Sequence, residues 1–102
     1  MQYLLVLQWS VASDSDFDEL IALENALEES LDESSDLDGH DIGPTEMNIF
    51  IYTDRPTESF LAAQGAAATW SRWPEVRAAY RSIGGETYTP VWPPNLRDFS
   101  IE

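Results

Sequence analysis

The stretch MNIFIYT, residues 47–53, predicts a β-strand, and the other elements of the fold can be assigned around it. Its side chains alternate with the two-residue period of a strand, so one face carries Met47, Ile49 and Ile51. The opposite face carries the polar and aromatic side chains of Asn48, Phe50 and Tyr52. Because the polar, turn-rich residues 34–43 lead into this strand, we predict a β-hairpin that ends at residue 53.

An inner strand and two helices surround this hairpin in the sequence. Residues 3–9, YLLVLQW, are apolar on both faces, as is typical of an inner strand. Residues 16–31 predict a helix that begins with Asp16 and Glu19 at capping-box spacing. Its apolar stripe consists of Phe17, Leu20, Leu23, Leu27 and Leu31. A second helix, at about residues 57–69 after Pro56, would face the sheet with Phe60, Leu61 and Ala67.

Residues 74–83 fit two templates. Pro74 at a first helical position and Gly84 as a cap favour a helix. A strand over residues 76–83, a Gly84-Gly85 turn and a strand over residues 86–92 fit as well. We favour the hairpin, while the helix stays open. The register of this hairpin places Arg81 opposite Tyr88 and Arg77 opposite Trp92, which gives two cation–π contacts.

The order of these elements predicts an α+β fold, a ferredoxin-like βαββαβ two-layer sandwich with an extra C-terminal strand that forms a hairpin. Residues 1–102 suffice for a single domain, in which residues 94–102 form a tail. The N-terminus has no basic region, and no apolar stretch approaches about 18 residues. We therefore expect a cytoplasmic protein without membrane contact. With no cysteine, the chain has neither disulfides nor a thiolate metal site.

The charge of the chain is strongly negative and unevenly distributed. The formal net charge is -14, and residues 1–54 hold 14 of the 19 acidic residues but none of the five basic ones. Such a field repels nucleic acids and attracts basic proteins. We therefore predict a protein partner, either a basic protein or a second copy, and no direct contact with nucleic acid. The simpler alternative, that the acids keep a small protein soluble, stays open.

An acidic patch is the predicted partner-binding surface. It consists of Glu28, Asp32, Glu33, Asp36, Asp38 and Asp41. Acidic side chains at this density would steer a basic partner toward the domain. The function predicted from the sequence is therefore an acidic protein-binding module, of the kind that an immunity protein or inhibitor represents.

An enzyme is the least favoured class, because the chain has one His, no Lys and no Cys. A polar site made of His40, Glu46 and Asn48 would carry acid/base chemistry if there is any, but we assign no catalytic residue. The acidic loop of residues 36–46 partly matches a calcium loop that would run over residues 34–45, yet Thr45 stands where that loop needs its bidentate Glu. We therefore predict no metal and no cofactor, and leave weak cation binding open.

Aromatic side chains form the second predicted surface, on the sheet. They are Trp9, Phe50, Tyr52, Tyr88 and Trp92. An exposed aromatic face on so acidic a domain favours a covering protein. The second functional hypothesis is therefore a homodimer that packs through this face and holds a small ligand between the sheets. Alternatively, the C-terminal tail folds back over the rings with Leu96, Phe99 and Ile101.

Two segments, DGHDIGPTEMNIFIYT (residues 38–53) and YRSIGGETYTPVWP (residues 80–93), resemble the signature stretches of a family of small, uncharacterised bacterial proteins. The resemblance covers about a third of the chain. It implies a bacterial cytoplasmic ferredoxin-like α/β sandwich and no known activity. The turn at Pro44-Thr45 departs from the family, whose members tend to have Ser-Gly there.

Overall fold

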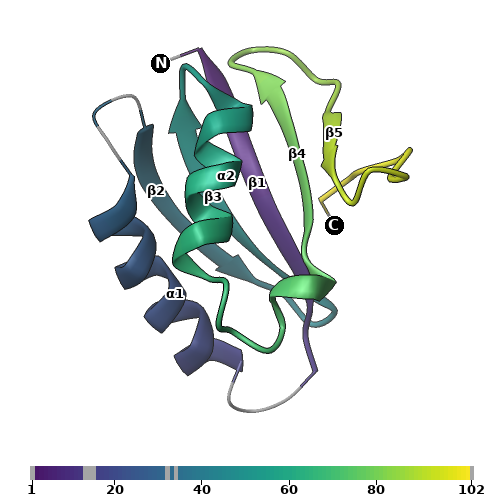
Figure 1. Cartoon of the computed structure of the whole chain (residues 1–102). Coiled ribbons are helices and arrows are strands. Elements are labelled where there is room, and N and C mark those ends of the chain that lie inside the picture. The colour runs from purple at the N-terminus through teal and green to yellow at the C-terminus, as the bar shows by residue number, and fades with distance from the viewer. Residues whose placement is uncertain (1, 13–15, 32, 34, 102) are drawn as a thin grey trace.

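A five-stranded antiparallel sheet, covered on one face by two helices, forms the framework of the protein (Figure 1). The computed structural model describes residues 2–12, 16–31, 33 and 35–101. The strands lie in the order β2-β3-β1-β4-β5. Their bounds are β1 Tyr3–Ser10, β2 Ser35–Ile42, β3 Glu46–Thr53, β4 Arg77–Ser82 and β5 Thr89–Trp92. The helices are α1 Asp16–Ser30, α2 Pro56–Ala66 and a short 3-10 helix, η1 Trp73–Glu75.

The predicted ferredoxin-like βαββαβ sandwich is wrong, although the α+β class is right. The sheet has five strands, because the chain turns after β4 and returns as β5 along the free edge of β4. The helix predicted as the alternative for residues 74–83 does not form: η1 ends at Glu75, and β4 begins at Arg77. None of the helices in the described ranges is long and apolar enough to cross a membrane.

The register of β5 on β4 differs from the predicted one. Trp92 lies opposite Ala78, so the predicted pairing of Arg77 with Trp92 is wrong. The register shifts at this point and the connection runs over residues 83–88, so the turn is longer than two residues. The predicted contact between Arg81 and Tyr88 is confirmed, with the guanidinium carbon 6.0 Å from the ring centroid.

The core lies between the sheet and the two helices. Alternation along β1 and β3 turns one set of side chains toward the helix layer, as predicted for residues 47–53. The core of sheet and helix side chains includes Leu5, Leu7, Trp9, Leu20, Leu23, Leu27, Met47, Ile49, Ile51 and Phe60. Two predicted stripe residues, Phe17 and Leu61, are instead 53% and 57% exposed. Leu61 is turned away from the core because it follows buried Phe60 by about 100° of helical rotation. Phe17 lies at the start of α1, and its ring lies against that of His40.

A β-bulge in β2 decides which side chains of this edge strand face the helices. The register shifts between Leu37 and Gly39, and Gly39 has a φ of 145°, which favours glycine. Leu37 lies opposite Ile51 on the helix side. Because of the extra residue, His40 also faces the helices, while Asp41 lies opposite Asn48 on the other face. Simple alternation would have placed both side chains on the reverse sides.

Among the described residues, no helix covers the second face of the sheet, and the C-terminal tail covers part of it. The Gln8 side-chain amide donates a hydrogen bond of 3.0 Å to the Ser100 carbonyl. The ring of Phe99 lies 5.1 Å from that of Tyr88. Gln8 and Asn48 are fully buried there. The tail therefore folds back onto the sheet at Gln8 and packs on one of the predicted rings, that of Tyr88.

Candidate functional site

The predicted acidic patch follows the edge of the sheet that β2 forms. Glu28, Glu33, Asp36, Asp38 and Asp41 are all exposed, at the end of α1, in the following turn and along β2. Asp32 lies outside the described residues. By the register of β2, Asp36 and Asp41 face away from the helix layer, so the acids lie on both sides of the edge. We call these five residues together with exposed Glu29 the acidic edge.

Most of the arginines have partners outside the acidic edge. Four of the five have other partners in the structure: Arg55 with Glu58, Arg72 with Asp16 and Glu75, Arg77 with Gln8, and Arg81 with Tyr88. None of these partners belongs to the acidic edge. The edge therefore keeps its negative field, which reaches about 8–10 Å into solvent at physiological salt.

Two acids of the edge stand at an unfavourable end of a helix. Glu28 and Glu29 lie in the last turn of α1, which contains no basic residue. The helix dipole places partial negative charge at this end, where cations stabilise and anions destabilise. Both glutamates therefore weaken the helix that carries them.

Replacing Glu28 and Glu29 with glutamine is expected to raise the free energy of unfolding by about 0.3–1 kcal/mol per site at low ionic strength. The gain should shrink in high salt, because the dipole interaction is screened. Urea denaturation at low and high NaCl measures both effects. As a control, Asp18→Asn in the favourable first turn of α1 should destabilise the protein. A shift of stability in the same direction for Asp18→Asn and for the Glu28 and Glu29 variants would contradict this explanation.

The predicted polar site of His40, Glu46 and Asn48 is split between the two faces of the sheet. His40 Nδ1 lies 2.5 Å from Glu24 Oε1 of α1, on the helix side. Glu46 and Asn48 point to the other face, where Asn48 is fully buried beside Gln8. The structure therefore does not bring His40 together with Glu46. His40 pairs with Glu24 of α1 instead.

The predicted aromatic surface is also split. Trp9 and Trp92 belong to the helix side, where the Trp92 ring stacks on Phe60 at 6.0 Å. Phe50 and Tyr52 lie on the opposite face and are half-buried. Tyr88 precedes β5 and packs on the tail. The five rings therefore form no common platform.

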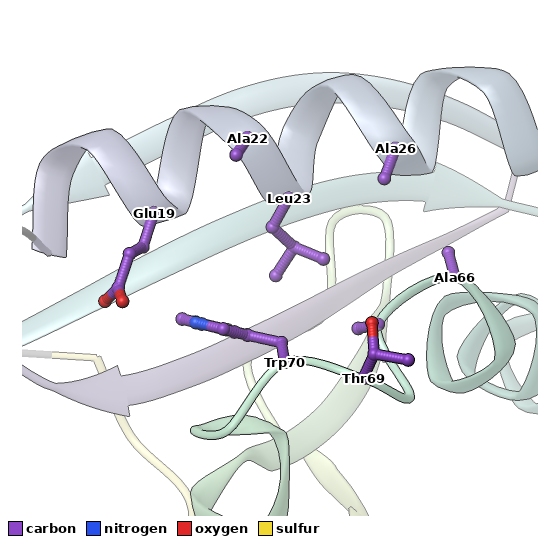
Figure 2. A pocket seen from close by; sticks show the side chains of 8 residues that line it. Glu19, Ala22, Leu23, Ala26, Ala66, Thr69 and Trp70 are labelled. Atoms are coloured by element: carbon purple, nitrogen blue, oxygen red, sulfur yellow. The ribbon is translucent and has the colours of Figure 1, made fainter.

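A hollow of about 280 Å³ lies between α1 and the chain that follows α2 (Figure 2). It is lined by Glu19, Ala22, Leu23, Ala26, Ala66, Ala67, Thr69 and Trp70. Figure 2 shows Leu23 and the Trp70 indole on facing walls, with the Glu19 carboxylate toward the end where the indole nitrogen lies. That nitrogen is buried and donates no hydrogen bond. No local sequence pattern indicates this site, because its two halves are about 45 residues apart and its walls are mostly alanine.

A buried ion pair holds the loop that carries Trp70. Arg72 Nη1 lies 2.6 Å from Asp16 Oδ1, and the two side chains are only 12% and 4% exposed. Arg72 Nη2 donates to the Ser10 carbonyl at 2.5 Å, and the Trp9 indole donates to the Arg72 carbonyl at 3.1 Å. The start of α1, the end of β1 and the loop are thereby joined, which fixes the shape of the hollow.

The described ranges contain no group of three or more His, Cys, Asp or Glu side chains that could hold a metal ion. Comparison with protein-family models, with curated proteins and with solved structures finds no match. The resemblance to a bacterial family through residues 38–53 and 80–93 therefore stays a prediction.

Proposed function

We propose that the protein is a binding module that recognises a basic protein partner through the acidic edge. The observation that supports this most is the position of Glu28 and Glu29 in the last turn of α1, without a cation in that turn. There the two charges oppose the helix dipole. Residues that reduce the stability of a fold are a common sign of a functional requirement.

Solubility alone does not account for this arrangement. A net charge of -14 exceeds the magnitude of about 2–8 that suffices for a small domain. Acids that serve only solubility could stand anywhere on the surface, including the helix start, where they stabilise. Concentrating them along α1 and β2 produces a directed field instead, and such a field accelerates encounter with a basic surface.

The partner would meet side chains of the acidic edge and not the backbone of β2. Although β2 is an edge strand, its bulge at Gly39 and its exposed aspartates disfavour pairing with a further strand. Small acidic proteins that inhibit a basic enzyme or neutralise a basic toxin work through such side-chain surfaces. An immunity or inhibitor role is therefore the most specific form of the proposal.

The homodimer and the enzyme are less favoured. A dimer through the second sheet face would have to accommodate the tail that lies there. An acid/base role for His40 would need a second polar group or a nucleophile beside the Glu24–His40 pair, and its described neighbours are Phe17 and Glu24.

Affinity purification from the source cells at low ionic strength tests the proposal. Two baits are compared: the wild-type chain and a variant with Glu28, Glu33, Asp36 and Asp38 changed to Gln or Asn, which keeps every buried contact described above. A basic protein retained by the wild type, lost with the variant and released by about 0.5 M NaCl is the expected result. Retention of the same proteins by both baits would exclude the acidic edge as the binding surface.

A further inference from the structure

The hollow between α1 and the chain after α2 exists because small side chains line both of its long walls. Ala22 and Ala26 lie one helical turn apart on α1, and Ala66 and Ala67 lie across from them. The volume of about 280 Å³ is slightly below the range of about 300–1,000 Å³ in which drug-sized ligands bind. The space therefore suits a single side chain of a partner.

Among the described residues that line this hollow, one carries a charge, Glu19. Glu19 has no hydrogen bond or ion pair among the described contacts. Arg72, whose guanidinium reaches the start of the same helix, is held by Asp16 and by the Ser10 carbonyl. The hollow therefore presents an uncompensated negative charge beside apolar walls, and the complementary occupant is a cation with an apolar stem.

The Trp70 indole forms the wall opposite α1 and strengthens the preference for a cation. Its ring packs on Trp9, with the centroids 5.1 Å apart and the planes at 61°, so its orientation is fixed. The face of a tryptophan ring attracts a cation more strongly than any other aromatic side chain. Glu19 and the ring face of Trp70 thus both favour a positively charged occupant.

We propose that this hollow receives an arginine side chain of the basic partner. The inference rests on the proposed function and names the anchor of that interface. The arginine stem would pack on the alanine walls, and its guanidinium would lie between the Glu19 carboxylate and the Trp70 ring. Arginine fits better than lysine, because a planar, weakly hydrated guanidinium stacks on aromatic rings and pairs with carboxylates. Glu19 lines the hollow on the α2 side of α1, whereas Glu28 follows Glu24, which contacts His40 of β2, by one helical turn, so the partner would cover α1 from both flanks.

Nuclear magnetic resonance with two matched probes tests the anchor without the partner. The full chain is titrated with n-butylguanidinium, which mimics the arginine side chain, and with n-butylurea, its neutral isostere. The readouts are the indole N–H signal of Trp70 and the methyl signals of Ala22, Ala26 and Ala66. We expect saturable shifts at these groups with n-butylguanidinium, and binding weaker by about fivefold with n-butylurea.

Three variants separate the hollow from general attraction between charges. Glu19→Gln should weaken n-butylguanidinium about fivefold and leave n-butylurea unchanged. Glu29→Gln removes the same charge about 15 Å further along α1 and should leave both affinities unchanged. Ala26→Leu fills the hollow and should abolish the saturable shifts. The proposal is overturned if neither probe shifts these signals, if both bind equally, or if Glu29→Gln weakens binding as much as Glu19→Gln.

The titration with n-butylguanidinium and the affinity purification that tests the proposed function can fail independently of each other. If the acidic edge retains a basic protein but n-butylguanidinium does not bind the hollow, the anchor is wrong and the binding function stands. With the purified partner, loss of the anchor should raise the dissociation rate constant, whereas loss of the acidic edge should lower the association rate constant.

Discussion

Replacing Arg72 with methionine is expected to lower the free energy of unfolding by about 3–5 kcal/mol, because it removes one member of a buried ion pair. The Asp16 side chain is 4% exposed and would lose its 2.6 Å contact with the guanidinium. It would keep its 2.5 Å hydrogen bond from the Ala12 amide, which cannot neutralise a carboxylate. Urea denaturation followed by tryptophan fluorescence measures the loss.

Arg55 provides the matched control for this substitution. It pairs with Glu58 at 3.2 Å, but both side chains are about two-thirds exposed, at 66% and 68%. Arg55→Met should therefore cost no more than about 1 kcal/mol. Combining Arg72→Met with Asp16→Leu should recover part of the loss, because the buried charge is gone as well. If Arg72→Met cost no more than Arg55→Met, the buried pair would not organise this corner.

Gln8→Met is the second substitution with a large expected effect, at about 2–4 kcal/mol for the buried groups it leaves without partners. Gln8 is fully buried and joins three segments of the chain. Its amide nitrogen donates to Asn48 Oδ1 at 3.1 Å and to the Ser100 carbonyl at 3.0 Å, and its oxygen accepts from Arg77. Because Arg77 can only donate, the direction of all three bonds is fixed.

A double-mutant cycle with Asn48 tests this account. Asn48 Nδ2 is already buried without a partner, and in Gln8→Met the Asn48 oxygen would lose its partner too. Asn48→Leu in the Gln8→Met background removes both groups, and replacing both partners by apolar side chains is often close to neutral. The double variant should therefore be more stable than Gln8→Met alone. Equal or lower stability of the double variant would show that the amides do not act as a pair.

The sequence predicted the parts of the fold that depend on local alternation. The buried set Met47, Ile49 and Ile51, the inner position of β1 and the hairpin of β2 and β3 follow from the strand period and the turn residues between them. The predicted C-terminal strand is present as β5, but its bounds and its irregular register on β4 follow a six-residue connection, which local patterns do not define.

The site residues show a similar limit. The bulge at Gly39 reverses the faces of His40 and Asp41, and one extra residue in a strand cannot be detected by counting alternation. The partners of the Asp16–Arg72 pair are 56 residues apart, and the hollow beside them forms only when α1 meets the loop after α2. Exposed acids could be located from the sequence, since charged side chains stay at the surface wherever the chain places them.

Stopped-flow fluorescence can measure the association rate constant between the purified partner and the protein as a function of NaCl concentration. This measurement tests whether the acidic edge recognises a basic partner. The acidic-edge variant with Glu28, Glu33, Asp36 and Asp38 neutralised should associate at least about tenfold more slowly than the wild type at low salt, and the two rates should converge as salt rises. Equal rates for both proteins at low salt would contradict the proposal that the acidic edge recognises a basic partner.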